Sequence, residues 1–570
     1  MRLSTDGDRD DAVALETIAA AADAGITVFD TARAYAAHDA ASEHNERLLA
    51  RALRRCGADG RARIVTKGGM ARAGGGWIPD GRAGAILGDC EASLAALDGL
   101  PIDLYLIHAP DPRTSWQTSV RALARLLREG MVTHVGLSNV NRRQLDEALD
   151  LVEVTAIQVA LSVFDDSAVR GGLLDSCEQR GVAVIAHSPL GGRRRARSLA
   201  RRTVLVEIGQ GRGATPEEVA LAWLLDLSPS VVAIPGARRP ETARSAAAAA
   251  AVRLDDKDRA LLNNSFAWPP PPRADPSPPA AGEGEVVVIM GIPGAGKTRH
   301  AGEYVARGYV RLNRDERGGS LSQLSDALQD TLASGVRRVV LDNTFLTRAA
   351  RSRVLETAVR NSVAARCVWI DTPLAQAQVN LVERLLDVSG SLPDPDALRL
   401  LARREPGILS PTRQMGRVRE LEPPAMDEGF VAVQRIPFTR LPKDTQVSQS
   451  ASEGVLVAAA ALAAPGWDQT IARCAPGTVH LLFDWRPGAP LDALDVEVAR
   501  LAAHVTGGVV PALCPHAGGP PVCWCRPPLP GLILDFARSH GIDLSRSALV
   551  GVSPAHRTLA AAVGARYVPV

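Results

Sequence analysis

Short apolar runs alternate with longer amphipathic segments through the first 268 residues of the chain. The runs, rich in Val and Ile, cover residues 26–32, 62–69, 102–110, 134–140, 154–162, 182–190 and 230–237. Segments with helical periodicity, such as 115–130 and 215–227, lie between them. Repeated strand–helix units of this kind predict a parallel sheet with helical crossovers. The natural closed form of such a sheet is a (β/α)8 TIM barrel, which needs one more strand before Ile26.

The chain offers only Met1–Leu3 for that first strand. Without it, the strands at Ile26–Asp30 and Val231–Ile234 would each keep an open edge, and the barrel would not close. We therefore expect either a minimal strand at Met1–Leu3 or a true start further upstream.

Two stretches interrupt the pattern and predict linkers. The first, "WPPPPRADPSPPAAGEGE", is too rich in proline for a helix or an inner strand, and the second, "TRLPKDTQVSQSASEG", is polar with few apolar residues. These stretches predict three domains and two linkers, at 1–268, 269–283 (linker), 284–440, 441–453 (linker) and 454–570. The whole chain is therefore predicted to be an α/β multidomain protein.

Composition narrows the function classes. A net charge of +2 over 570 residues gives no global field for nucleic acid or membrane, so any polyanion site must be local. No apolar run reaches the roughly 18 residues that span a bilayer, and the acidic N-terminus lacks a signal-peptide core. Eight cysteines in a chain of this length do not indicate a disulfide scaffold. We expect a cytoplasmic protein without a membrane partner.

Polar residues follow several strands of the first domain, where a barrel places its chemistry: Asp30, Tyr35, Lys67 and His108. The motifs "GITVFDTARAY", "IVTKGG", "DLYLIHAPD", "VGLSNV", "HSPLGG" and "IPGARRPE" occur in order over about 260 residues. Together they resemble the aldo-keto reductase family.

That resemblance implies hydride transfer from NADPH to a small aldehyde or ketone. Tyr35 would donate the proton, and a nearby Lys67, paired with Asp30, would lower the tyrosine pKa from roughly 10. His108 would orient the carbonyl group. The residues that match the family's cofactor positions are Ser138, Asn139, Gln158, Ser188, Gly236, Arg238 and Arg239. The two arginines would meet a 2′-phosphate, which favours NADP over NAD.

A second motif opens the middle domain. "GIPGAGKT" fits G-x-x-x-x-G-K-[ST], follows the apolar strand "EVVVIM" and precedes a helical segment. Gly291, Gly294 and Gly296 would let backbone N–H groups surround the phosphates of ATP, Lys297 would neutralise their charge, and Thr298 would bind Mg²⁺. We expect a P-loop α/β/α domain that binds a nucleotide.

The later motifs "YVRLNRDE", "RRVVLDNTFLTRAARSRV" and "AQVNLVERLL" resemble the kinase domain of polynucleotide kinases. The resemblance implies that Asp315 accepts the proton of an attacking 5′-hydroxyl of DNA or RNA. Arg384 would contact the transferring phosphate, and Asn343 and Thr344 would shape the acceptor side. A kinase for a small-molecule hydroxyl is the alternative. A basic groove would favour nucleic acid, and its candidate residues are Arg311, Arg314, Arg317, Arg337, Arg338, Arg348, Arg351 and Arg353.

Metal-ligand spacing marks the last domain. Cys514, His516, Cys523 and Cys525 form C-x-H, six residues, C-x-C within "CPHAGGPPVCWCRPPLPG". Four such ligands suit tetrahedral Zn²⁺ and leave no open position, so the predicted site is structural.

This loop and "LVGVSPAHRTLAAAVGARYV" resemble the haloacid dehalogenase phosphatases that carry a zinc loop, such as histidinol phosphatases. The resemblance implies a small Rossmann-like domain. The family's phosphate-restraining lysine and its Mg²⁺-binding aspartate correspond to Pro527 and Val552, and "LFDWRPG" with Asp484 is a poor substitute for D-x-D-x-T. We expect a folded domain without phosphatase activity.

The leading hypothesis is a fusion of an NADPH-dependent carbonyl reductase, an ATP-dependent polynucleotide 5′-kinase-like domain and an inactive phosphatase-like domain. Two alternatives stay open. Either the reductase alone is active beside a regulatory ATP-binding module, or the barrel is an inactive scaffold for the kinase.

Overall fold

A computed structural model describes most of the chain, namely residues 3–5, 10–37, 42–73, 76–266, 268, 284–439, 452–475, 477–490, 492–517 and 521–570. The chain divides into two compact units, one of Met1–Pro276 with Thr347–Ser352 and one of Ser277–Leu346 with Arg353–Val570. The first predicted linker, 269–283, lies outside the described residues, as do residues 441–451 of the second. No helix within the described ranges is long and apolar enough to cross a membrane.

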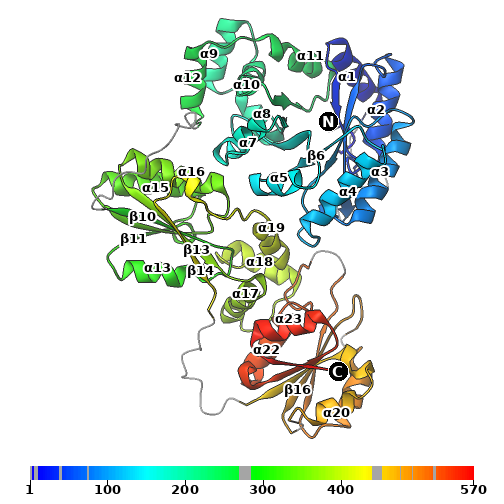
Figure 1. Cartoon of the computed structure of the whole chain (residues 1–570), viewed down its shortest axis with the longest axis vertical. Coiled ribbons are helices and arrows are strands. Elements are labelled where there is room, and N and C mark those ends of the chain that lie inside the picture. The colour runs from blue at the N-terminus through cyan, green and yellow to red at the C-terminus, as the bar shows by residue number, and fades with distance from the viewer. Residues whose placement is uncertain are drawn as a thin grey trace. The chain divides into compact units, whose positions relative to one another are not determined.

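A seven-stranded parallel sheet with the order β1-β2-β5-β6-β7-β8-β9 forms the centre of the first unit. Its strands are β1 (Val28–Asp30), β2 (Arg63–Gly68), β5 (Leu104–Ile107), β6 (His134–Ser138), β7 (Ala156–Ala160), β8 (Ala183–His187) and β9 (Val231–Ala233). Each strand falls within one of the seven predicted apolar runs. The barrel-like strand–helix architecture predicted from the sequence is confirmed (Figure 1).

Helices pack around this sheet. They are α1 (Asp11–Asp23), α2 (His44–Arg55), α3 (Ala83–Leu97), α4 (Trp116–Arg128), α5 (Arg142–Leu149), α6 (Ser167–Arg170), α7 (Leu173–Gln179), α8 (Gly192–Leu199), α9 (Thr203–Arg212), α10 (Pro216–Leu225), α11 (Pro240–Ala248) and α12 (Asp256–Ser265). The start of α10 shows why such segments are helical: Thr215 and Glu218 form a capping box, and Pro216 occupies the first turn.

The two ends of the sheet keep free edges among the described strands. There β1 pairs only with β2, and β9 pairs only with β8. Helices α1 and α11 pack against each other. Leu3 is in a turn and is buried in the same core as Ile18 and Phe29, so it is not part of the minimal strand considered for Met1–Leu3. Residues 1 and 2 lie outside the described ranges.

A short antiparallel hairpin follows the second barrel strand and was not predicted. It consists of β3 (Met70–Ala73) and β4 (Gly76–Pro79). A strand of four residues is too short to show a recognisable alternation of apolar and polar positions beside the longer apolar runs. The hairpin carries Trp77, which is 42% exposed despite its large apolar side chain.

The second unit begins with a five-stranded parallel sheet in the order β11-β12-β10-β13-β14. Its strands are β10 (Glu285–Met290), β11 (Val310–Asn313), β12 (Arg338–Asp342), β13 (Ala364–Asp371) and β14 (Ala432–Pro437). Its helices are α13 (Lys297–Val305), α14 (Arg314–Arg317), α15 (Leu321–Ala333), α16 (Arg348–Arg360), α17 (Leu374–Ser389), α18 (Pro395–Arg404) and α19 (Pro411–Arg419). Because β10 is fully flanked, its residues Val286–Met290 are all buried, as the apolar run predicts.

A second parallel sheet, in the order β17-β16-β15-β18-β19, forms the C-terminal part of this unit. Its strands are β15 (Gly454–Ala458), β16 (Val479–Trp485), β17 (Val509–Cys514), β18 (Ala548–Gly551) and β19 (Arg566–Pro569), and its helices are α20 (Trp467–Ala472), α21 (Asp495–Ala502), α22 (Gly531–His540) and α23 (Pro554–Val563). Numbered within the domain the order is 3-2-1-4-5, so the predicted Rossmann-like architecture is confirmed. One apolar cluster joins α17 and α18 to α22 and α23.

Candidate functional sites

Lys67 lies at the centre of the first site. The end of β2 carries it into the interior, where its side chain is fully buried and Nζ lies 2.6 Å from Asp30 Oδ1. The ammonium also donates to the Thr31 carbonyl at 2.8 Å and to the Tyr35 hydroxyl at 3.4 Å. Despite its burial, Asp30 and Tyr35 hold the pKa of Lys67 above its usual value. The lysine therefore stays charged next to the tyrosine.

Tyr35, His108 and Trp77 form an aromatic group over this lysine. The ring centroids of Tyr35 and His108 are 5.6 Å apart, and both lie 5.9 Å from the ring of Trp77. Burial lowers the pKa of His108 to about 3, with a further contribution from Lys67, so the imidazole is neutral at ordinary pH. Its Nδ1 is buried and has no hydrogen-bond partner among the described residues. A polar ring atom left in this way can serve a ligand.

The pKa of Tyr35 differs from the value that the sequence analysis predicts. Lys67 does lower the pKa of Tyr35, but desolvation by burial is larger, and the net direction is upward. The hydroxyl is therefore held in its protonated form, ready to give a proton rather than to lose it beforehand.

A cavity of about 1120 Å³ opens above these groups. Most of the predicted cofactor residues line it: Ser138, Asn139, Gln158, Ser188, Gly236 and Arg238. Arg239 is not on the wall; it precedes α11, where its backbone N–H donates to Thr242 Oγ1 at 3.2 Å. The wall thus carries neutral hydrogen-bonding side chains near Tyr35 and a cationic side chain at Arg238, which fits an amide-bearing ring joined to an anionic phosphate.

Two wall residues were missed from the sequence. Trp77 comes from the unpredicted hairpin, and His187 ends β8 within the quoted "HSPLGG" motif. His187 Nε2 lies 3.1 Å from Asn139 Oδ1, and Asn139 Nδ2 donates to the His108 carbonyl at 2.9 Å. Asn139 has a positive φ of 57°, so its backbone is held in a conformation that turns its side chain between the two histidines.

The second site is the loop between β10 and α13. Gly294 has φ +87°, and a Cβ there would lie 2.3 Å from the Ala377 carbonyl oxygen. Gly296 has φ +89° and directly precedes α13. Lys297 Nζ donates to the carbonyls of Gly291 and Ile292, each at 3.0 Å. Glycines in these conformations and a helix N-terminus make an anion cradle, so the predicted phosphate loop has the required shape.

Two carboxylates act on Lys297. Burial lowers its pKa to about 8, whereas Asp342 and Asp315 oppose that shift and Arg384 adds to it. Both predicted side chains, Asp315 and Arg384, are thus close enough to influence the lysine. Thr298 is exposed in the first turn of α13.

Asn313 is a connection that the sequence did not reveal. Its Nδ2 donates to Asp342 Oδ2 at 3.0 Å, while its Oδ1 accepts from the backbone N–H of Asp315 at 2.7 Å. Asp342 is 2% exposed and is also held by Arg311 at 2.6 Å. One amide therefore fixes the start of α14, and with it Asp315, relative to Asp342.

The arginines proposed for a basic groove do not form one surface. Arg351 is fully buried, and Arg311 pairs with Asp342 and Glu316. Arg338 begins β12, the strand whose other end carries Asp342, roughly 13 Å away at 3.3 Å per residue. Only some of the eight arginines can therefore lie near the phosphate loop.

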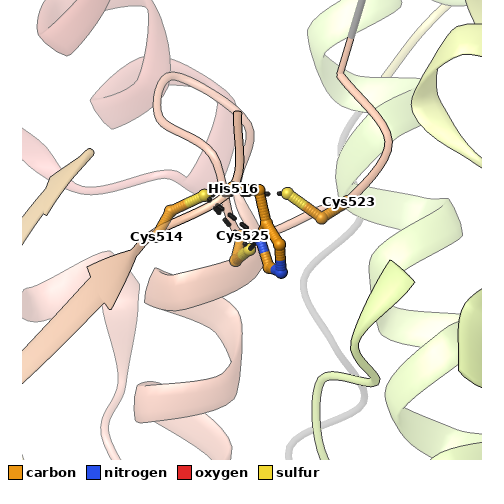
Figure 2. Close-up of side chains that lie close together, drawn as sticks. All are labelled: Cys514, His516, Cys523 and Cys525. Atoms are coloured by element: carbon orange, nitrogen blue, oxygen red, sulfur yellow. Dashed lines mark hydrogen bonds between the residues drawn. The ribbon is translucent and has the colours of Figure 1, made fainter. Parts of the chain in front are cut away.

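The third site brings together the four predicted metal ligands (Figure 2). Cys514 ends β17, and the loop after it returns with His516, Cys523 and Cys525. Their ligand atoms lie within 4.8 Å of one another, with Cys514 Sγ 3.7 Å from Cys523 Sγ and 3.4 Å from Cys525 Sγ, and His516 Nδ1 3.2 Å from Cys525 Sγ. A tetrahedral Zn²⁺ with bonds of about 2.3 Å requires sulfur atoms roughly 3.8 Å apart, so the residues fit this metal.

The end of β15 bears on phosphatase chemistry. In a parallel sheet of this order the reacting groups collect at the carboxyl end of the central strand. There the chain has Ala458 and Ala459, and Val552 follows the neighbouring β18. Asp484, at the end of β16, is engaged by Arg486 at 2.9 Å.

Two parts of the chain match known protein families. Residues 1–265 match the Aldo/keto reductase family, and residues 286–406 match an AAA domain. Aldo-keto reductase str7 of Strobilurus tenacellus is 29% identical over 273 residues, covering 42% of this chain and 76% of that protein. Probable aldo-keto reductase 1 of Glycine max is 30% identical over 264 residues, covering 41% and 73%. A solved aldo/keto reductase from Klebsiella pneumoniae in complex with NADP and acetate is 27% identical, covers 48% of this chain and 90% of its own, and has a TM-score of 0.39.

The first part of the chain therefore belongs to the aldo/keto reductase family of oxidoreductases. The AAA match adds a P-loop nucleotide-binding domain after it. The predicted reductase and P-loop assignments are confirmed at this level, while the finer likenesses to polynucleotide kinases and to zinc-loop phosphatases stay predictions.

Proposed function

We propose that the first unit reduces a small aldehyde or ketone with NADPH. The observation that carries the proposal is that Asp30, Tyr35 and His108 line one cavity, with Lys67 buried against Asp30 and within hydrogen-bond distance of the Tyr35 hydroxyl. Family membership gives the reaction class, and Arg238 on the same wall supports NADPH over NADH.

Each side chain has a defined task in this reaction. The Tyr35 hydroxyl gives its proton to the carbonyl oxygen as negative charge develops there, and charged Lys67 stabilises the phenolate that remains. Neutral His108 offers a ring nitrogen to the same oxygen, and Trp77 covers the site against water. NADPH, when bound along Ser138, Asn139, Gln158 and Ser188, supplies the hydride.

A matched pair of tyrosine variants tests this assignment. Tyr105 is fully buried in the same unit, and its hydroxyl donates to the Ile86 carbonyl at 3.1 Å away from the cavity wall. With a panel of aldehydes and the nicotinamide absorbance as readout, Tyr35→Phe should lose turnover by at least about 100-fold, whereas Tyr105→Phe should retain it. Full turnover in Tyr35→Phe would contradict the proposed proton donor.

We further propose that the P-loop domain transfers the terminal phosphoryl group of ATP to the 5′-hydroxyl of a polynucleotide. The observation that favours a kinase is the link between Asp315 and Asp342 through Asn313, with Asp342 in register with Ile289, two residues before the phosphate loop begins at Gly291. Asp315 would take the proton of the attacking hydroxyl, Arg384 would contact the transferring group, and Thr298 with Asp342 would hold Mg²⁺. Arg314 and Arg317 flank Asp315 and are the cations placed to meet an anionic acceptor.

Labelled ATP should be offered with 5′-hydroxyl RNA, 5′-hydroxyl DNA and a free nucleoside. We expect Asp315→Asn to abolish transfer and to leave ATP binding intact, because it removes the base and not the phosphate cradle. Asp326→Asn, an exposed position on α15, is the matched control. Transfer to the nucleoside alone would favour the small-molecule kinase, and unchanged transfer in Asp315→Asn would refute the base.

For the C-terminal domain we propose a structural Zn²⁺ and no phosphatase activity. The four ligand atoms support the metal, and Ala458, Ala459 and Val552 stand where carboxylates would be needed. Metal analysis should find about one equivalent of zinc, lost in Cys523→Ser, and no hydrolysis of a phosphate monoester. No disulfide joins the described cysteines, and three of them are among the proposed zinc ligands.

A further inference from the structure

The loop that carries the metal ligands also contacts the P-loop domain. Between Cys523 and Cys525 lies Trp524, which is 2% exposed. Its indole Nε1–H donates to the Leu409 carbonyl at 2.8 Å, and its ring belongs to the apolar cluster that contains Leu385 and Ile408. This tryptophan has metal ligands on both sides in sequence, so its position depends directly on the geometry of the metal site.

A second hydrogen bond joins the same two elements. Thr412 Oγ1, in the first turn of α19, donates to the Pro521 carbonyl at 2.7 Å. Pro521 lies two residues before Cys523. Both ends of this short segment are thus attached to the region 409–412, which leads into α19.

Helix α19 reaches the phosphate-binding loop directly. Gln414 is fully buried, and its Nε2 donates to the Pro293 carbonyl at 3.1 Å, in the middle of the loop. The same region also lies against Arg384, because a Cβ added at Gly407 would be 2.5 Å from the Nη1 of this arginine. A continuous set of contacts therefore runs from the metal loop through residues 407–414 to the phosphate cradle.

We propose that metal binding at Cys514, His516, Cys523 and Cys525 fixes α19 against the phosphate-binding loop and so controls nucleotide affinity. The proposal rests on the proposed zinc site and nucleotide-binding function. Metal orders the segment 521–525, Trp524 and Pro521 then hold residues 409–412, and Gln414 holds Pro293. Without the metal the ligand loop has no cross-link, and residues 409–412 lose the two attachments that hold the start of α19.

The hydrogen bond of Trp524 can be removed without touching a metal ligand. Trp524→Phe keeps an aromatic ring and removes the Nε1–H donor, so it should retain one equivalent of zinc and bind MgATP about 3- to 10-fold more weakly, the range for one hydrogen bond. Trp467→Phe is the matched control, since Trp467 is 6% exposed in a separate apolar cluster of the same domain. That variant should bind MgATP as the parent does.

Metal removal gives the direct test on the full chain. Zinc is removed with a chelator, the chelator is dialysed away, and MgATP affinity and amide hydrogen exchange are compared with the zinc-loaded protein. We expect at least a 10-fold loss of affinity and faster exchange in Pro411–Arg419, with exchange in β10 unchanged. Equal affinity and equal exchange in the two forms, or a purified protein without bound metal, would overturn the proposal.

Hydrogen exchange keeps the two hypotheses separable. If the zinc-loaded protein fails to bind MgATP, the proposed kinase function fails, and the exchange of α19 with and without zinc still decides the proposed coupling. If MgATP binds equally well in both forms while exchange is unchanged, the kinase assignment stands and the coupling is refuted.

Discussion

The buried pair of Lys67 and Asp30 allows stability and catalysis to be measured separately. The two side chains are 0% and 6% exposed, and their charged atoms are 2.6 Å apart. Lys67→Met leaves the Asp30 carboxylate with Gln158 Nε2 as its donor at 2.7 Å. Asp30→Asn leaves the ammonium with the Thr31 carbonyl at 2.8 Å. Each single variant therefore buries one charge without its counter-ion.

Removing one partner of a buried ion pair costs about 3–5 kcal/mol of unfolding free energy, because the remaining charge is uncompensated. For a unit of this size that is a fall of roughly 6–20 °C in the unfolding temperature, at about 2–4 °C per kcal/mol. The double variant Asp30→Asn/Lys67→Met buries no charge, and Gln158 still has an oxygen acceptor. It should lie within about 1–2 kcal/mol of the parent protein.

Calorimetry of the full chain measures the transitions, and hydrogen exchange in α10 identifies the one that belongs to the first unit. Carbonyl reduction with NADPH is measured in parallel. We expect the double variant to recover stability and to stay inactive, because Tyr35 no longer has an ammonium beside its hydroxyl. Single variants that lose less than about 1 kcal/mol would refute the energetic reasoning. A double variant with parental turnover would refute the role given to Lys67.

Three further expectations concern other parts of the chain. Burial raises the pKa of Glu46 to about 7, so the folded protein keeps a proton that the unfolded chain loses near pH 4.5. The free energy of unfolding should therefore fall by up to about 3 kcal/mol as the pH rises from 4.5 to 7. Calorimetry of Glu46→Gln should not show this pH dependence. Burial lowers the pKa of His108 to about 3, so this imidazole does not titrate between pH 5 and 8. The pH profile of kcat/KM should therefore have the same shape over that range in the parent protein and in His108→Gln. Gly294→Ala places a Cβ 2.3 Å from the Ala377 carbonyl oxygen at φ +87°, so ATP binding by calorimetric titration should be lost; parental affinity would mean that the loop adapts.

The periodic parts of the sequence predicted the fold well, because long apolar runs between amphipathic helices leave few alternatives to parallel sheets. All seven strands of the first sheet lie within predicted runs, and β10 covers the same residues as the predicted strand "EVVVIM". The hairpin with Trp77 was missed, since two four-residue strands have no usable period. The list of groove arginines was wrong at Arg351, because a sequence does not show that this side chain is buried.

For the candidate sites, too, the motifs identified some residues, whereas other properties depend on burial and strand pairing. Lys67 contacts Asp30 and Tyr35, and Lys297 contacts two carbonyls of the phosphate loop, while the roles of both lysines stay predictions. The direction of the Tyr35 pKa could not be obtained from the motif, because it depends on a desolvation that outweighs the neighbouring ammonium. Asn313 was overlooked for a related reason, since its importance comes from a strand pairing that sets it beside Asp342.

Asn313 links the two acidic residues of the P-loop domain, Asp342 and Asp315, by hydrogen bonds. One planar amide contacts the side chain of Asp342 on one side and the backbone of Asp315 on the other. Asp342 belongs to β12, whereas Asn313 and Asp315 move with β11, so the register of the two strands sets the distance between the two acids of the proposed kinase. Catalytic spacing in this domain is then a property of strand register, and mutations that loosen β11 should impair chemistry without touching either acid.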